Sequence, residues 1–177
     1  MNRLIHLYLT IVFIACLSGS VAGQGYESAV GIRFGYPTAV TYKKHFSEKT
    51  AVDLFAGFVS SHYWSSFDAG LIIQFHYPIE VANVDNLNWY WGLGGRVSFW
   101  NYNDRFYRYY YYRYWDQEDK GTGFGIMGNV GAQYTFDDLP LNVSIDWMPG
   151  FMIHGIYYHR GFTGSYGGVT ARYVLSR

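Results

Sequence analysis

The chain has 177 residues, enough for one domain, and carries 13 basic and 13 acidic side chains, so its formal net charge is zero. Half of the residues are hydrophobic, 21% are aromatic and only 15% are charged, whereas soluble domains carry about 25% charged residues. The balanced charge gives no sign of nucleic-acid binding, which usually needs a clearly basic face. The shortage of charge predicts that much of the outer surface does not contact water.

Residues 1–22 have the features of a secretory signal peptide. Arg3 supplies the positive start, residues 7–17 form an apolar core that is too short to span a bilayer, and small residues end at Ala22 and Gly23. The only cysteine, Cys16, lies inside this segment, and lipid attachment at Cys16 is the alternative to cleavage after Ala22 or Gly23. We therefore expect residues 1–22 to be removed and residues 23–177 to form one exported domain.

The rest of the chain alternates apolar and polar residues in eight runs separated by turn residues, and this pattern predicts β-strands. No apolar stretch reaches the roughly 20 residues of a transmembrane helix. We place the strands at residues 26–36, 38–47, 50–60, 65–77, 87–100, 122–136, 140–151 and 165–175.

Each predicted strand has one apolar and one polar face, because successive side chains of a strand point to opposite sides. The apolar face collects large side chains, among them Val30, Ile32, Phe34, Tyr36, Val40, Leu54, Phe58, Leu71, Ile73, Trp89, Trp91, Leu93, Ile126, Val130, Ile145, Trp147, Val169 and Tyr173. The other face collects glycines and polar groups. Lys44 alone breaks the separation of charges, and we expect its long stem to reach the interface from a strand end.

The width of an eight-stranded barrel decides which face points inward. Its interior is only just wide enough to be filled by side chains, so the bulky apolar set does not fit there, whereas the glycine-rich polar set does. Membrane barrels carry an apolar outer band flanked by aromatic residues, and a closed barrel satisfies every backbone hydrogen bond in lipid. The sequence therefore predicts an all-β fold, an eight-stranded antiparallel up-and-down transmembrane β-barrel.

The connections between the predicted strands give the barrel an orientation. With the N-terminus in the periplasm, short turns at residues 47–49 and 137–139 and the segment 78–86 lie on the periplasmic side. The long aromatic-rich connections at 101–120 and 154–164 then lie together on the opposite side. We expect that side to face the cell exterior.

One segment and the last strand carry a family resemblance. The segment is Asp138-Leu139-Pro140-Leu141-Asn142-Val143-Ser144-Ile145-Asp146-Trp147-Met148-Pro149. It resembles the turn and seventh strand of the outer-membrane β-barrel domain family, and Gly168, Ala171 and Tyr173 resemble the insertion signal of such barrels. The whole pattern resembles small Gram-negative outer-membrane proteins of the OmpA/OmpX-like, opacity-like class. The resemblance implies the outer membrane as location, with outer-membrane lipids, lipopolysaccharide and the barrel-insertion machinery as partners. We predict no cofactor.

The polar face carries charges of both signs, which the predicted topology places in the lumen. They are Arg33, Lys43, Arg96 and Arg172, nearly balanced by Asp53, Asp68 and Asp146. Buried charges must be paired, so we predict a hydrogen-bonded ion network that plugs the lumen. An ion or proton path is the alternative.

The segment 102–115 alternates tyrosine with arginine and is the candidate ligand-binding loop. These two residue types dominate binding hot spots, and stacked aromatics with arginine suit glycans or anionic head groups. The candidate binding residues are Arg105, Tyr107, Arg108, Arg113 and Trp115. A polyanion, an extracellular glycan, a lipopolysaccharide sugar or a surface protein would fit. The alternative is a hairpin whose rings cover one another and anchor at the headgroup level.

The leading functional prediction is a non-enzymatic barrel with a structural or surface-recognition, adhesin-like role. The alternative is a lipid A acyl hydrolase or transferase, since His45 and Ser47 have a His-x-Ser spacing, although our topology places them at the periplasmic end. Ser61, His62, His154 and His159 lie in the outer loops, where nothing orders them as nucleophile, base and orienter. His154 and His159 could bind a metal with Asp116 or Glu118, but loop histidines at such spacing are a weak indication, so we predict neither a catalytic nor a metal site. A soluble periplasmic barrel that binds a lipid is the third possibility.

Overall fold

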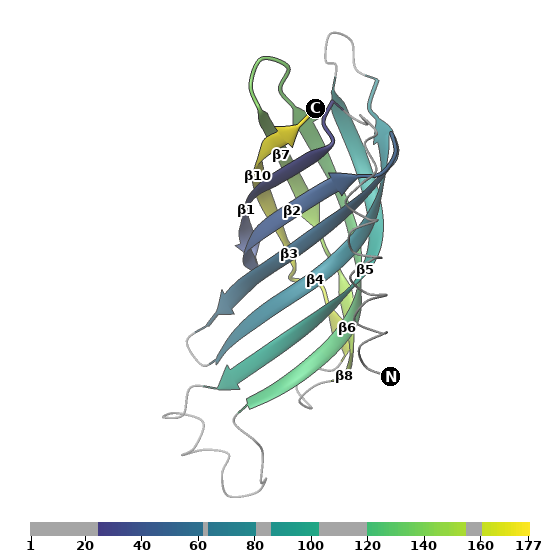
Figure 1. Ribbon diagram of the computed structural model, residues 1–177. Helices are drawn as coiled ribbons and strands as arrows, with labels where there is room; N and C mark the ends of the chain where they lie inside the picture. The colour runs from purple at the N-terminus through teal and green to yellow at the C-terminus, as the bar shows by residue number, and fades with distance from the viewer. Residues whose placement is uncertain (1–24, 62–63, 81–85, 103–119, 155–160) are drawn as a thin grey trace, which may run out of the picture.

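The computed structural model describes residues 25–61, 64–80, 86–102, 120–154 and 161–177, and these form a single β-sheet (Figure 1). No helix in this part of the chain is long and apolar enough to cross a membrane. The strands are β1 (Ser28–Tyr36), β2 (Thr38–His45), β3 (Thr50–Ser60), β4 (Trp64–Pro78), β5 (Leu87–Tyr102), β6 (Lys120–Thr135), β7 (Leu141–Trp147), β8 (Gly150–His154), β9 (Gly161–Thr163) and β10 (Gly167–Ser176).

The sheet closes into a barrel of eight antiparallel strands. Strands β1 to β6 pair in chain order, β6 pairs with both β7 and β8, and β10 pairs with β1 as well as β7. Because β7 and β8 keep one register against β6, with Val130 opposite Trp147 and Met127 opposite Gly150, they are two parts of one strand. β9 and β10 form the last strand, although the register shifts by one residue between them, from Thr163 opposite Gly150 to Gly167 opposite Trp147. The predicted up-and-down barrel is confirmed.

The last two strands differ from the prediction because each is interrupted. The predicted strand 140–151 is broken at Met148 and Pro149, since proline has no N–H to donate to the ladder. The Gly128 amide donates to the Pro149 carbonyl at 2.7 Å, and the Met148 amide donates to the Tyr166 carbonyl at 2.8 Å. These two bonds hold the broken segments of both strands together. The final strand therefore begins at Gly161 and not at residue 165, and it is interrupted at residues 164–166.

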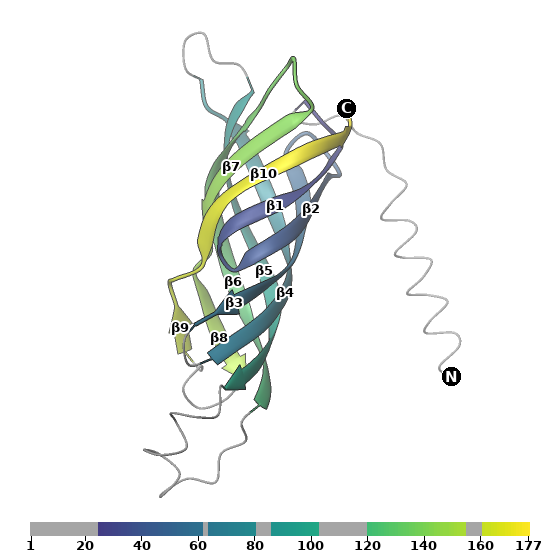
Figure 2. The ribbon, with the colours of Figure 1, turned by 90° about the vertical axis from the view of Figure 1, so that its left-hand side faces the viewer.

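The outer face of the barrel is apolar, as expected. Aliphatic side chains in its middle, such as Ile32, Ile126 and Ile145, are 49%, 59% and 61% exposed. Aromatic pairs occupy the two ends of the long strands: Phe75 with Trp91 and Tyr77 with Trp89 at one end, and Phe58 with Phe67 and Phe67 with Phe99 at the opposite end. The first of these ends is the one at which β10 and the chain finish (Figure 2). We call these the turn end and the loop end.

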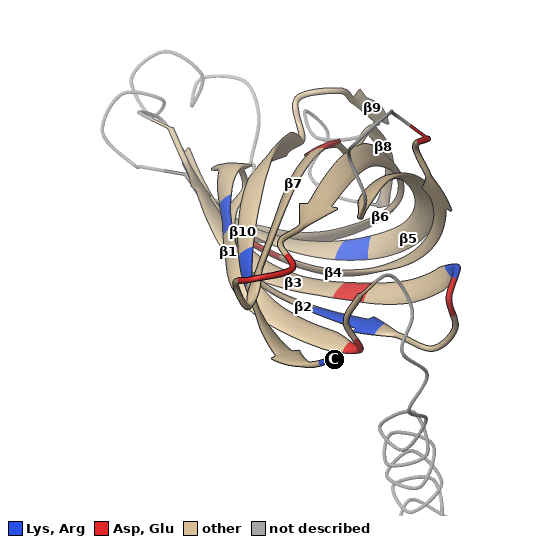
Figure 3. Ribbon diagram, turned by 90° about the horizontal axis from the view of Figure 1, so that it is seen from above, with Lys and Arg blue, Asp and Glu red and all other residues tan. Residues whose placement is uncertain are grey.

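The inner face carries the charges, and Figure 3 shows charged positions on strands around the ring. Two residues depart from the predicted sides. Lys44, at the turn end, is buried, with its Nζ 3.8 Å from Glu27 Oε1 and 5.9 Å from the Phe46 ring centroid. Tyr36 does not join the outer band, because the chain reverses at Pro37 and turns the Tyr36 ring against Tyr166, 5.1 Å between centroids.

Candidate functional site

Two buried ion pairs cross the lumen. The Arg33 Nη2 donates to Asp146 Oδ2 at 2.7 Å, and Arg172 Nη2 donates to Asp53 Oδ2 at 2.8 Å. The same Arg33 nitrogen lies 4.0 Å from Asp53 Oδ2, and Arg172 also donates to Ser144 Oγ at 2.8 Å. Arg33, Asp53 and Arg172 are fully buried, and Asp146 is 7% exposed. Two carboxylates thus hold two guanidinium groups that come from opposite ends of the chain.

Neutral polar side chains extend this network towards the turn end. Gln74 Nε2 donates to Asn129 Oδ1 at 2.8 Å, and the Tyr90 hydroxyl donates to Asp146 Oδ2 at 3.2 Å. Lys43 donates to Gln133 Oε1 at 3.0 Å, and its Nζ lies 4.5 Å from the centroid of the Tyr90 ring. Side chains from strands all around the barrel therefore meet at its axis, where the interior of an eight-stranded barrel is filled by side chains.

Two histidines lie at the turn end of the lumen. His45 and His76 are fully buried, with ring centroids 5.0 Å apart, and within the described part of the chain none of their ring nitrogens has a hydrogen-bond partner. Ser47 Oγ accepts from the Thr50 amide at 3.1 Å as part of the β2–β3 turn, so no hydrogen bond joins it to His45. Among the described residues no group of three or more His, Cys, Asp and Glu side chains is placed to hold a metal ion.

A small pocket lies at the loop end of the lumen. Its volume is about 90 Å³, and it is lined by Tyr36, Trp64, Arg96, Trp100, Met152, Thr163, Ser165 and Tyr166. We call it the mouth pocket. Arg96, which is 5% exposed, donates through Nε to Met152 Sδ and through Nη2 to Thr163 Oγ1, both at 3.2 Å. Its guanidinium carbon lies 3.8 Å from the centroid of the Tyr166 ring.

Asp68 lies near the mouth pocket without lining it. Its Oδ2 accepts a hydrogen bond of 2.7 Å from the Tyr166 hydroxyl, and no ion pair joins it to Arg96 within the described part of the chain. The structure thus places all seven predicted network residues in the lumen but divides them into a central network and the separate Arg96 and Asp68 at the mouth.

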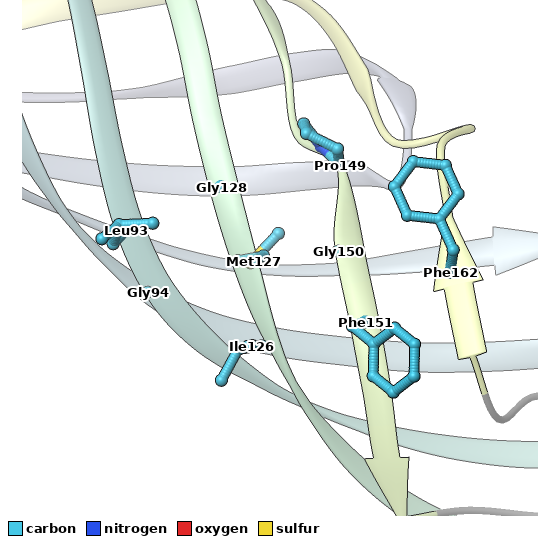
Figure 4. A pocket seen from close by; sticks show the side chains of 9 residues that line it. All are labelled: Leu93, Gly94, Ile126, Met127, Gly128, Pro149, Gly150, Phe151 and Phe162. Carbon is cyan, nitrogen blue, oxygen red and sulfur yellow. The ribbon is translucent and has the colours of Figure 1, made fainter.

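An apolar groove of about 380 Å³ lies on the outer face, at the break between β7 and β8 (Figure 4). Gly128 lowers its floor, because it lies at an outward position of β6 and has no side chain. Leu93 and Ile126 lie on one side of it, and Pro149, Phe151 and Phe162 lie on the other. The groove therefore lies within the apolar outer band.

The predicted loop site lies outside the described residues. This holds for Arg105, Tyr107, Arg108, Arg113 and Trp115, for His62, His159, Asp116 and Glu118, and for the signal segment 1–22, while only the backbone of His154 is described. The flanking strands show where this segment begins and ends, because the β5–β6 ladder continues as far as the pair of Asn101 and Lys120. Both ends of segment 103–119 therefore start from the loop end, close to the mouth pocket.

Comparisons with protein-family models, with curated proteins and with solved structures found no match to this chain.

Proposed function

We propose that the protein is an integral outer-membrane β-barrel of the OmpA/OmpX-like type, in which a plugged barrel presents recognition surfaces at its loop end. In this proposal the barrel has a structural role, and ligands bind outside the central lumen. The N-terminus and the turn end face the periplasm, and the loop end faces the cell exterior.

The observation that supports membrane insertion is that the barrel has its charged side chains inside and its apolar side chains outside, the reverse of a soluble protein. Fully buried Arg33 and Arg172 lie inside, while aliphatic residues such as Ile126 and Leu93 are 59% and 62% exposed outside. Soluble monomers rarely expose contiguous apolar patches larger than a few hundred Å², and this band surrounds the barrel. Lipid is the solvent that suits such a surface, and aromatic pairs at both ends match the girdles of membrane barrels.

The plugged lumen supports a structural role in place of a transport role. Arg33, Asp53, Asp146 and Arg172 meet across the barrel, and each ion pair is closed by a bond of 2.7 or 2.8 Å. Breaking a buried pair leaves an uncompensated charge, which is strongly unfavourable. A network of this kind therefore favours a rigid scaffold.

The recognition part rests on the segment that joins β5 and β6. It contains Arg105, Arg108 and Arg113 among tyrosines, residue types that are enriched in binding hot spots. Its flanking strands end at the loop end, on the side away from the turns. An extracellular glycan, a lipopolysaccharide sugar or a surface protein is the proposed ligand, which gives the protein an adhesin-like role.

Quenching of tryptophan fluorescence by brominated acyl chains tests the membrane part. Trp91 is 39% exposed on the outer face, and Trp100 is 5% exposed on the inner face. Two variants, each retaining one of these residues and carrying Phe at the other Trp positions, are reconstituted in brominated vesicles. We expect strong quenching of Trp91 and little of Trp100; equal, weak quenching of both would contradict membrane insertion.

A variant with serine at positions 105, 107, 108, 113 and 115 tests the recognition part. Cells that display the wild-type chain are expected to bind immobilised glycans or host proteins, and cells with the serine variant are expected to lose that binding at equal surface abundance. Unchanged binding by the variant would remove the loop from the proposed function.

A further inference from the structure

Arg96 is the lumen arginine without a carboxylate partner in the described part of the chain. Arg33 is paired with Asp146 and Arg172 with Asp53. The remaining lumen carboxylate, Asp68, accepts from the Tyr166 hydroxyl. A guanidinium that is 5% exposed and lacks a counter-ion is costly unless an acceptor reaches it.

The guanidinium of Arg96 keeps free donors that border the mouth pocket. It has five N–H groups, of which two are used: one by the weak thioether acceptor of Met152 and one by the Thr163 hydroxyl. The Tyr166 ring covers one face of its plane at 3.8 Å and fixes its orientation. The free edge suits a carboxylate or phosphate, whose oxygens accept two parallel bonds from arginine.

The volume of the mouth pocket limits what can enter. A cavity of roughly 150 Å³ holds a benzene molecule, so a pocket of about 90 Å³ admits a group smaller than a benzene ring. A carboxylate or phosphate group fits this limit. The rest of such a ligand must therefore lie outside, against the rim of the pocket.

Partly exposed aromatic rings and hydroxyl groups form that rim. Tyr36 and Trp64 stand edge to face with centroids 6.5 Å apart, and Ser165 is exposed beside them. Aromatic faces pack against the C–H groups of a sugar ring, and hydroxyl side chains bond to sugar hydroxyls. We propose that the mouth pocket binds an acidic sugar, with its carboxylate or phosphate on Arg96 and its ring against Tyr36 and Trp64.

This inference rests on the recognition role proposed above and names a ligand class for it. Asp68 is the described acidic residue linked to the pocket, through Tyr166. Its bonded oxygen faces the Tyr166 hydroxyl at 2.7 Å, and Asp68 is not among the lining residues. The charge that an entering oxyanion meets directly is therefore that of Arg96.

Titration of the full-length protein in detergent micelles tests the proposal. The probes are glucuronate, glucose 6-phosphate and neutral glucose, and the readouts are calorimetry and the fluorescence of Trp64 and Trp100. We expect the two acidic sugars to bind at least about tenfold more tightly than glucose, since a bond to a charged group is worth that factor or more. If lipopolysaccharide displaces glucuronate, the natural ligand is a sugar of the membrane's own lipid. If it does not, the natural ligand is a free glycan.

Variants separate the pocket from general charge effects. Arg96→Met is expected to reduce glucuronate binding to the level of glucose, and Arg96→Lys is expected to retain part of the preference. Arg177→Gln removes one exposed positive charge at the turn end, where Arg177 donates to backbone carbonyls, and should leave binding unchanged. If Arg96→Met does not fold, Trp64→Ser provides the test. It removes the aromatic ring at the rim of the mouth pocket and should weaken the binding of all three sugars.

Two outcomes would overturn the proposal: equal binding of glucuronate and glucose by the wild type, or unchanged glucuronate binding by folded Arg96→Met. The loop variant with five serines distinguishes this failure from failure of the recognition role. If that variant keeps glucuronate binding and Arg96→Met loses it, the site is the pocket. If it loses glucuronate binding while Arg96→Met keeps it, the anion binds the loop, and only the pocket proposal falls.

Discussion

The Arg172 guanidinium meets the Asp53 carboxylate at 2.8 Å inside the barrel, although 119 residues separate them in the chain. Asp53 also lies 4.0 Å from Arg33 Nη2, so one carboxylate serves two arginines. Both arginines are fully buried. The stability of the lumen therefore depends on Asp53 more than on any exposed acidic residue.

Asp53→Asn should destabilise the barrel by about 3–5 kcal/mol, because it leaves buried arginines without their carboxylate. The free energy of unfolding, measured by urea titration in vesicles, checks this value. Asp138→Asn, in an exposed turn, is the control with the same change of charge. Adding Arg172→Gln to Asp53→Asn should recover part of the loss. Equal unfolding free energies of Asp53→Asn and Asp138→Asn would contradict the buried network.

Gly131 lies where strand β6 passes Tyr90 and Asp146. A Cβ atom at this position would lie 2.4 Å from the Ile145 carbonyl oxygen and 2.7 Å from Tyr90 Oη. Gly131→Ala should therefore cost about 1–3 kcal/mol of unfolding free energy through overpacking.

Gly95→Ala is the matched control for Gly131→Ala, since the nearest atom to its added Cβ is the Gly125 carbonyl oxygen at 3.7 Å. We expect this outward-facing variant to unfold at nearly the wild-type urea concentration. A larger loss at Gly95 than at Gly131 would show that the inner and outer faces are assigned wrongly.

Ile126→Lys tests the solvent of the outer face. Ile126 is 59% exposed on β6, between the aromatic ends of the barrel. A lysine near the middle of a bilayer costs about 2–4 kcal/mol, whereas near the interface it costs about 0–1 kcal/mol. Leu139→Lys, in the turn between β6 and β7 and 51% exposed, should fall in the lower range. Similar unfolding free energies for both variants in vesicles would favour a water-exposed band.

The fold could be predicted because a strand alternates its faces at every residue and because a narrow barrel admits one of the two faces. The period-2 pattern of β3, β4 and β5 fixes both the strands and the inward side of Asp53, Asp68 and Arg96. Which charges pair could not be predicted. Arg33 and Asp146 are 113 residues apart, and their contact depends on the register of strands around the whole barrel.

The mouth pocket could not be predicted from the sequence pattern either. Tyr36 belongs by parity to the outer face, and only the reversal at Pro37 turns its ring towards Tyr166. Tyr166 lies in a stretch rich in Gly and Ser, where no periodicity assigns a side. Arg96 was predicted to lie in the lumen, but its separation from the central network follows from its partners Met152 and Thr163, which gave no sequence signal.

Closure of the barrel by its terminal strands predicts a change of gel migration on heating. β1 and β10 pair from Ser28 opposite Ser176 to Tyr36 opposite Gly167, so the first and last strands are joined along their whole length. A closed ladder leaves no strand edge to open, and we expect the unboiled protein to migrate differently from the boiled protein in dodecyl sulfate gels. Ala171 faces outward on this seam. Ala171→Pro should abolish the unboiled band because proline interrupts a ladder, while Ala171→Val, on the same face, should keep it. A wild-type chain with one position before and after boiling would contradict closure at this seam.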